Sequence, residues 1–175
     1  MKTIREQIIE RIINQLKTIT TDNGYHSDIG TGPIYRQEAV TDKGYTPAIS
    51  IWELVESRER NSYGGTVRLL TIKIEVIILV NGDQHSATIS NELLGDIEKA
   101  LIMGNTTLDE LIDDIQDVAT EISQLPFERA LTCVTSNDSD KITPLPINRK
   151  LAGATIDFDI KYTTEWGDPY TPHRH

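Results

Sequence analysis

Apolar residues at helical spacing dominate the first twenty positions of the chain. Isoleucine or leucine recurs at intervals of four, four, four and three residues, at Ile4, Ile8, Ile12, Leu16 and Ile19. This spacing places them on one face of a helix and leaves the charged residues on the other. Thr3, followed three positions later by Glu6, fits a capping box at the start. The pattern predicts a helix over residues 3–19 that packs against a sheet.

A second helical pattern follows in the middle of the chain. Ile89, Leu93, Ile97 and Leu101 recur every four residues, and Gly104 follows as a candidate C-terminal cap. We therefore expect a second helix over residues 86–103.

Alternation of apolar and polar residues predicts the strands. It is clearest over residues 66–80, where every second position from Ile72 to Val80 is apolar. That segment of fifteen residues exceeds the usual strand of about 3 to 10 residues, so it should bend or project from its sheet. Similar alternation predicts strands over residues 48–55 and 154–162. Shorter candidates cover 25–29, 33–39 and 130–135.

The segment 107–122 fits two patterns. Thr107 with Glu110 resembles a helix cap, and apolar residues keep helical spacing as far as Ile122, but Val118, Thr120 and Ile122 also alternate. We favour a short helix over 107–114 and then a strand. Residues 57–65 and 136–149 are polar and rich in turn formers, so they are predicted to be loops.

These elements together predict an α+β fold. A mostly antiparallel, twisted sheet should pack with an N-terminal helix and a second, central helix. With 175 residues, the chain is expected to form one domain over 1–164, followed by an extended C-terminal tail over 165–175.

The charge balance narrows the function. The chain has 17 basic and 27 acidic residues, a formal net charge of −10, which argues against wrapping nucleic acid by neutralising its phosphates. A single cysteine, Cys133, excludes an internal disulfide framework. No signal peptide or apolar run long enough for a membrane span is visible, so we expect a cytosolic protein.

Motifs for catalysis are absent from the sequence. It contains no phosphate-binding loop, dinucleotide fingerprint, nucleophile elbow or zinc-binding helix motif. The fragment Gly30-Thr31-Gly32 is too short for a phosphate loop, and the four histidines are scattered. We interpret the acidic run 109–114 as a solvated helix face, because it lacks the calcium-loop pattern. No catalytic, cofactor-binding or metal-binding residue is therefore predicted.

Two polar or aromatic segments are candidate contact sites. The first is the loop containing Arg58, Glu59, Arg60 and Asn61, which is costly to bury and is followed by two glycines.

The second is the segment after the last strand, with Trp166, Asp168, Pro169 and Tyr170. Its aromatic side chains are of the kind that anchor interfaces. The alternatives are a frayed terminus, or a tryptophan that folds back on its own sheet and covers the core edge.

The order of elements resembles the tail terminator proteins of long-tailed bacteriophages, the family of the lambda minor tail protein U. Two local patterns carry the resemblance. One is the helix beginning Ile4-Arg5-Glu6-Gln7-Ile8-Ile9, followed later by the strand Pro47-Ala48-Ile49-Ser50-Ile51-Trp52. The other is the closing strand into Tyr162-Thr163-Thr164 and then Gly167-Asp168-Pro169-Tyr170.

This resemblance implies a structural virion protein that forms a homohexameric ring at the head-proximal end of the tail. The ring would cap the tail tube, stop its polymerisation and present the surface that joins the head or neck. Its partners would be further copies of itself, the tail tube protein and a head-completion protein, and DNA would pass through without specific binding. The alternatives are a head-completion or neck protein and, in another class, a small cytosolic enzyme with its site in loops 57–65 and 136–149.

Overall fold

Five strands form one sheet in the order β1-β2-β3-β5-β4. The computed structural model describes residues 1–40, 46–80, 84–104, 108, 110–122 and 151–173. The strands are β1 (Ile34–Arg36), β2 (Ala48–Arg60), β3 (Gly65–Leu79), β4 (Asp114–Ile122) and β5 (Leu151–Glu165). All neighbouring strands are antiparallel except β1 and β2. With its two helices, the molecule has the expected α+β fold.

The first helix begins where the capping pattern predicts. In α1 (Ile4–Leu16), the Thr3 hydroxyl accepts a hydrogen bond from the backbone N–H of Glu6. The helix ends three residues before the predicted Ile19. The N–H groups of Thr18 and Ile19 bond to carbonyls only three residues back, at Gln15 and Leu16, which tightens the last turn and ends the helix. Ile19 stays fully buried beyond it.

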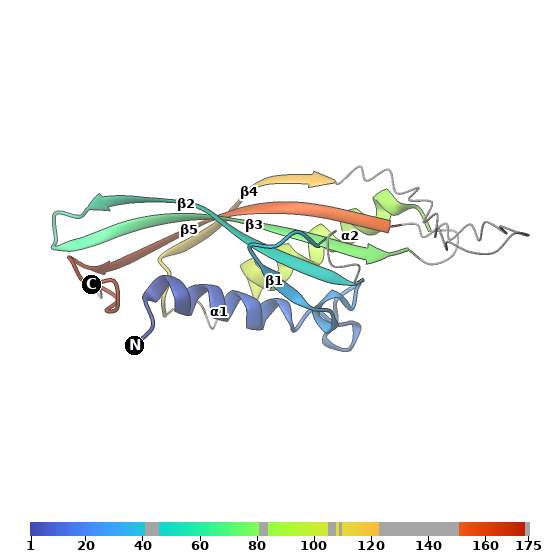
Figure 1. Ribbon diagram of the computed structural model, residues 1–175, viewed down its shortest axis with the longest axis horizontal. Helices are drawn as coiled ribbons and strands as arrows, with labels where there is room; N and C mark the ends of the chain where they lie inside the picture. Colours follow the sequence, from blue (N-terminus) through green and yellow to red (C-terminus); the bar gives the residue numbers. More distant parts are fainter. Residues whose placement is uncertain (41–45, 81–83, 105–107, 109, 123–150, 174–175) are drawn as a thin grey trace, which may run out of the picture.

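The second helix is confirmed over its predicted length, and its last turn is π-helical. It comprises α2 (Ser86–Glu98) and a π-helical turn, η4 (Lys99–Met103). Both helices contribute to one apolar core together with the facing residues of the sheet. The largest fully buried side chains are mostly isoleucines, with Phe158 and Tyr162. Figure 1 shows both helices along the sheet.

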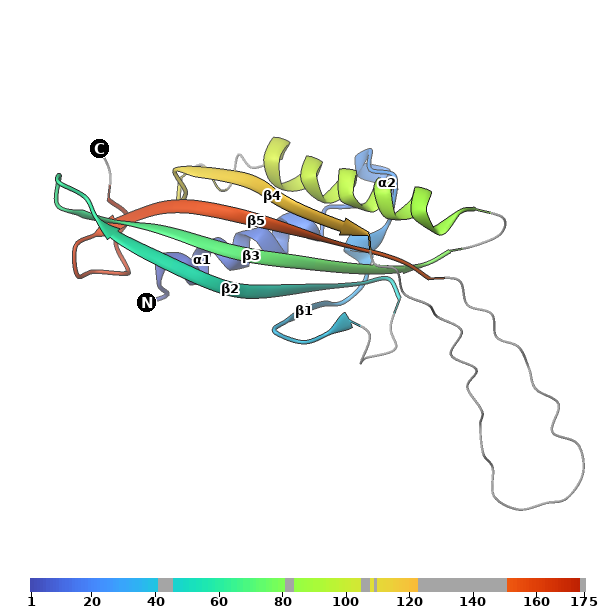
Figure 2. The same cartoon turned by 90° about the horizontal axis from the view of Figure 1, so that it is seen from above.

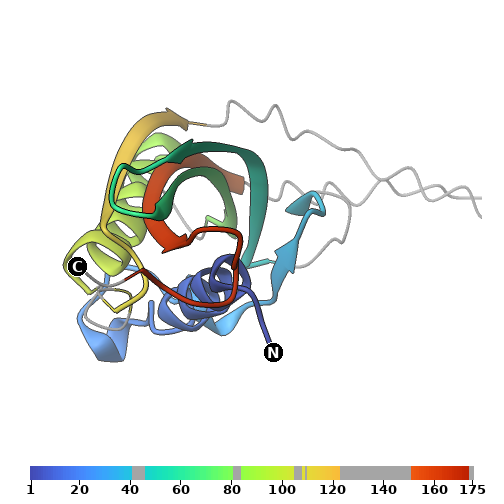
Figure 3. The same ribbon diagram turned by 90° about the vertical axis from the view of Figure 1, so that its left-hand side faces the viewer.

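The long strand β3 does not project alone. It occupies the middle of the sheet and pairs with β5 along its whole length, from Gly65 opposite Glu165 to Leu79 opposite Leu151. It pairs with β2 on the other side as far as Thr66. Three long strands therefore support one another, and the sheet curves strongly across its width, as the end-on view shows (Figure 3).

The ambiguous segment before β5 resolves as turn and strand. The backbone N–H groups of Leu111 and Ile112 both bond to the Leu108 carbonyl, and Asp113 already donates to Lys161 on β5. The chain is therefore committed to the sheet before a helix can extend, and the short helix over 107–114 is not formed in the described residues. The predicted strand is confirmed as β4, so alternation, rather than helical spacing, was the informative pattern.

The minor predicted strands are only partly correct. Residues 25–29 form no strand and lead into a short 3₁₀ turn, η2 (Ile29–Thr31), while the candidate over 33–39 shortens to β1. Close packing explains why glycine occupies positions 30 and 32. A side chain at Gly32 would meet the Pro47 carbonyl oxygen at 2.0 Å, and one at Gly30 would meet the carbonyls that end α1 at 2.7 Å. The predicted elements over 130–135 and 136–149 lie outside the described residues.

The predicted loop over 57–65 is wrong in extent. β2 continues to Arg60 and β3 begins at Gly65, so only residues 61–64 form the turn. The strands continue because β5 pairs with β3 as far as Gly65, opposite Glu165. The β2–β3 hairpin therefore extends past the first turn of α1 (Figures 1 and 2). We call residues 58–67 with 163–173 the hairpin end.

The core assignment can be tested at Ile74, which is fully buried in the centre of β3. Ile74→Asp places an unpaired charge in the core, and we expect a loss of several kcal/mol of unfolding free energy, measured by urea denaturation. Ile74→Val should cost about 1 kcal/mol. Leu54→Asp, at a half-exposed position, is the matched surface control, and equal stability of both aspartate variants contradicts the assignment.

Candidate assembly surface

The structure brings the two predicted contact segments together. The pairing of β2 with β3 and of β3 with β5 places Arg60, Thr66 and Thr164 side by side. Arg60 lies over the ring of Trp166, with its guanidinium carbon 3.6 Å from the ring centroid. Segments separated by a hundred positions in the chain therefore form one continuous surface at the hairpin end.

Asn61 shapes the turn of the hairpin. Its backbone N–H donates to the Gly65 carbonyl at 2.8 Å, and its side-chain oxygen accepts from the N–H of Tyr63 at 3.2 Å. Gly64 has a positive φ of 95°, a conformation that glycine adopts readily. The predicted contact residue Asn61 is therefore also a turn former, and it leaves Tyr63 exposed at the tip.

The C-terminal segment does not run away from the domain as an extended tail. Gly167, with φ of 78°, turns the chain, and the segment returns along β5. Glu165 N–H donates to the Thr171 carbonyl and His173 N–H to the Thr163 carbonyl, both at 3.0 Å. The end of β5 has backbone N–H and C=O groups on the side that β4 does not reach. The returning segment forms hydrogen bonds with these groups, which explains why it folds back.

Asp168 and Pro169 hold the segment in place. The Asp168 carboxylate accepts hydrogen bonds from the Tyr170 N–H and the Thr171 hydroxyl, and these lower the pKa of Asp168. The Pro169 carbonyl accepts from the N–H of Ile4 at 3.0 Å, which satisfies a free donor at the first turn of α1. Both residues were predicted to make intermolecular contacts, and within this chain their polar groups serve the fold.

The aromatic side chains of this end remain exposed although the backbone is fixed. Tyr63 is 79 % exposed, Trp166 60 % and Tyr170 41 %. With Arg60 beside Trp166, they present planar side chains that have few rotatable bonds to immobilise. Such groups suit protein–protein contact. The hairpin end therefore combines a hydrogen-bonded backbone with aromatic side chains that the rest of the described residues leave exposed.

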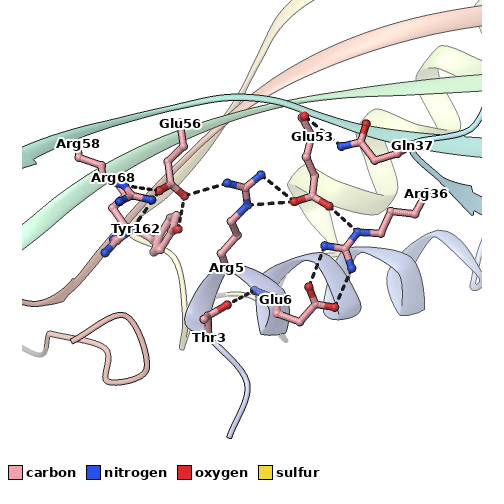
Figure 4. A network of polar contacts seen from close by, with 10 residues as sticks. All are labelled: Thr3, Arg5, Glu6, Arg36, Gln37, Glu53, Glu56, Arg58, Arg68 and Tyr162. Carbon is pink, nitrogen blue, oxygen red and sulfur yellow. Dashed lines mark hydrogen bonds and ion pairs between the residues drawn. The ribbon is translucent and has the colours of Figure 1, made fainter. Parts of the chain in front are cut away.

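A buried carboxylate, Glu56, supports this end from within. Its side chain is only 4 % exposed, and it lies on the same face of the sheet as the core. The carboxylate accepts hydrogen bonds from the Tyr162 hydroxyl at 2.6 Å, from Arg58 at 2.7 Å and from Arg68 at 3.0 Å. The core face of the sheet thus changes from apolar to ionic where α1 begins (Figure 4).

Arg5 on α1 links Glu56 to a second buried carboxylate. Its guanidinium contacts Glu53 at 2.8 Å and Glu56 at 3.7 Å. Arg36, at the end of β1, donates a hydrogen bond to Glu53. It also donates two hydrogen bonds, of 2.7 and 2.8 Å, to the Glu6 carboxylate. The network therefore connects the first helix, the edge strand and the three long strands (Figure 4).

Electrostatics in the network favours its charged forms. Burial raises the pKa of Glu56, but hydrogen bonds from Tyr162, Arg58 and Arg68 outweigh burial and hold the pKa below the ordinary 4.5. Burial, and then the bond to Glu56, raise the pKa of the Tyr162 phenol. The hydrogen bond from Arg36 lowers the pKa of Glu6. The group is therefore an ionic framework at neutral pH.

Sequence reasoning did not identify this network. Its two buried carboxylates occur in a strand whose inward positions were expected to be apolar, and Arg5 was assigned to the polar face of its helix. The available signal was a pair of charged residues at alternate positions of one long strand, Glu56 and Arg58, but alternation alone does not say which charges are inward. A bulge between Glu53 and Glu56 shifts the register and hides the pattern.

A hollow at the opposite end of the sheet is the main candidate for a small-molecule site. Its lining includes His26, Asp28 and Glu92, beside apolar residues from β3 and α2. The nearby Asp96 carboxylate is buried and accepts hydrogen bonds from the backbone of His26 and Ser27 and from the Ser27 hydroxyl. Asp96 thus anchors the loop 25–29 rather than facing a ligand.

The described residues contain no cluster of three or more potential metal ligands. Within the same part of the chain, no helix has the length and apolar character needed to cross a membrane. Comparison with protein-family models and with curated protein sequences found no match for this chain.

Glu56→Gln tests the network. It keeps the size of the side chain but leaves three arginines around a neutral amide, so we expect a loss of about 2–4 kcal/mol of unfolding free energy at pH 7. Because the pKa of Glu56 is lower when folded, parent stability should fall as pH drops below about 5.5, and the variant should lose less. Urea titrations across pH measure both effects. Glu59→Gln, at an exposed site on the other face, should match the parent.

Proposed function

We propose that this chain is a structural virion protein of a long-tailed bacteriophage, a tail terminator that forms a ring at the head-proximal end of the tail tube. The ring, of six subunits by the resemblance drawn above, stops tube polymerisation and provides the joining surface for the head or neck. The observation that carries the proposal is the hairpin end, where two distant segments form a fixed, uncovered surface of arginine and aromatic side chains.

An uncovered aromatic surface on a rigid support is typical of a subunit built for assembly. The backbone of the C-terminal segment is fixed by Ile4 and by β5, so little ordering entropy is lost when its side chains are covered. The aromatic side chains and Arg60 belong to the types that dominate interface energies. Tube protein and the head-completion protein are the partners that the resemblance implies for this surface.

The charge of the chain suits passage of DNA. Six copies at −10 each carry a formal −60, so the ring repels a polyanion and DNA slides through without specific contact. A protein that retained DNA would need a cationic surface, whereas four of the arginines here neutralise the carboxylates of the internal network.

Two alternatives remain distinguishable. A head-completion or neck protein shares the same joint and the same need for an uncovered surface, so binding to tube separates it from a terminator. For the enzyme alternative, one of the two loops expected to hold its site is a short, regular hairpin turn at residues 61–64. Loop 136–149 lies outside the described residues.

Ring formation and capping are tested together. Purified chain is examined by multi-angle light scattering and negative-stain imaging over a range of concentrations, with and without tail tube. We expect a closed ring, with one ring at a single end of each tube and arrested tube growth. A strict monomer that leaves tube growth unchanged contradicts the proposal, and a ring that ignores tube but binds the head-side connector supports the neck alternative.

Trp166→Ala with Tyr170→Ala tests the aromatic surface itself. Because Trp166 is mostly exposed and Tyr170 is 41 % exposed, their removal should change the unfolding free energy by only about 1 kcal/mol. Assembly should weaken by roughly thirtyfold or more, since truncating one anchor typically costs about 2 kcal/mol. Light scattering and tube binding measure the loss.

Deletion of residues 167–175 serves as the contrast. It removes the Pro169 carbonyl that caps Ile4, so this variant should lose subunit stability as well. If the double alanine variant loses stability without any change in assembly, the aromatic residues only cover the domain.

A further inference from the structure

Strand β2 has an edge that the described residues leave largely uncovered. β1 pairs with it only from Ile49 to Ile51, and Gln37 extends the coverage by bonds to the carbonyls of Ile51 and Glu53. From residue 54 to Arg60, no described strand lies beside this edge. Its outward backbone groups are available for pairing with another strand.

Strand β4 forms the other edge of the sheet. It pairs with β5 on one side, and within the described residues it is the last strand in the sheet order. Most of its residues are exposed. A subunit with one open edge on each side has two different surfaces that can pair head to tail.

The two edges carry matching irregularities at the same level of the sheet. Pairing across the strands aligns Glu53, Ile72, Phe158 and Asp117. On β2, a bulge follows Glu53 and exposes Leu54 and Val55 by 49 % and 65 %. On β4, a bulge after Asp117 exposes Val118 by 51 %. Apolar side chains are therefore exposed on both edges within a few residues of one level.

The two edges carry opposite charges near the start of β4. Toward the hairpin end, β2 carries Arg58, Glu59 and Arg60, and β4 begins with Asp114. Asp117 and Glu121 lie farther from this end, level with Glu53 and Ser50. Cross-strand pairing places Asp114 level with Ser57, one residue from Arg58. Bulges and charged residues often protect a sheet edge from pairing. If protection were their purpose here, charges of the same sign on both edges would serve it better. The opposite charges of Asp114 and Arg58, which lie within one residue of the same level, favour contact between the two edges.

We propose that β4 of one copy of this chain pairs, antiparallel, with β2 of a second copy, so that sheets join edge to edge around the ring. β4 and β2 run in opposite directions within one sheet, and rotation about an axis parallel to the strands preserves those directions. The contact joins the apolar bulges and places Asp114 of β4 near the exposed Arg58 of β2. This inference rests on the proposed ring, and it names the surfaces that close it.

Cysteine cross-linking between copies tests the pairing. Cys133, the single cysteine, is replaced by serine in the full-length chain, and Val55→Cys and Val118→Cys are made separately. Each variant is assembled alone or mixed with the other and treated with a short bismaleimide. We expect cross-linked dimers in the mixture and none from either variant alone, because only a head-to-tail contact brings residue 55 of one copy near residue 118 of another.

The outcomes separate this inference from the proposed function. Rings without the mixed cross-link, or a cross-link from one variant alone, overturn edge pairing and leave the terminator proposal standing. If rings cap tubes while cysteines at positions 55 and 118 still react with a maleimide, edge pairing is likewise overturned and the terminator proposal stands. Mixed cross-links in open oligomers that never cap a tube support the pairing and contradict the terminator proposal. A strict monomer with no cross-link contradicts both.

A charge reversal provides an independent test. Asp114→Lys places like charges at the matching level of both edges, and association should weaken by roughly fivefold or more, with little change in the melting temperature of the subunit. Glu98→Lys, on the exposed side of α2, is the control and should associate as the parent does. Equal weakening in the control shows that net charge, rather than edge pairing, governs association.

Discussion

The ionic framework around Glu56 is the interaction on which the rest of this structure depends. The three long strands extend farther than the helices that cover them, so apolar packing cannot continue to the end of the sheet. Beyond Leu70 and Ile160, the inward face is filled by Glu56, Arg68 and Tyr162 instead. A carboxylate buried there requires several donors, because an unpaired charge is costly to desolvate. Those donors come from four separate segments.

This framework explains how an end of the molecule with few apolar contacts stays rigid. Arg5 joins the sheet to α1, and Arg36 joins it to β1. The C-terminal segment adds a bond to the first turn of the same helix. Assembly surfaces benefit from such rigidity, because side chains held on a fixed backbone lose less entropy when a partner covers them. The ionic interior and the aromatic exterior of the hairpin end are thus two sides of one arrangement.

The strongest periodic patterns predicted the elements that form the core. Spacing of four residues located both helices, and alternation located the three long strands, because burial of one face imposes the period of each element. Local chemistry was also readable at Thr3, which caps α1 as expected. The weak patterns failed where long-range pairing competes with local preference. At the predicted helix over 107–114, the Asp113 N–H instead donates a hydrogen bond to β5. At the predicted loop over 57–65, the end of β2 forms a strand because β3 and β5 extend beside it.

The sequence by itself determined the α+β class, the two helices and the apolar faces, since each depends on periodicity within one segment. It also identified Arg60 as costly to bury and Trp166 as a candidate interface anchor. Only the tertiary structure decided that these two residues stack on each other, that the tail turns back to cap α1, and that Glu56 is buried among arginines. The physical reason is that each of these contacts joins segments far apart in the chain, and their partners are chosen by sheet order, register and two bulges, which no local pattern encodes.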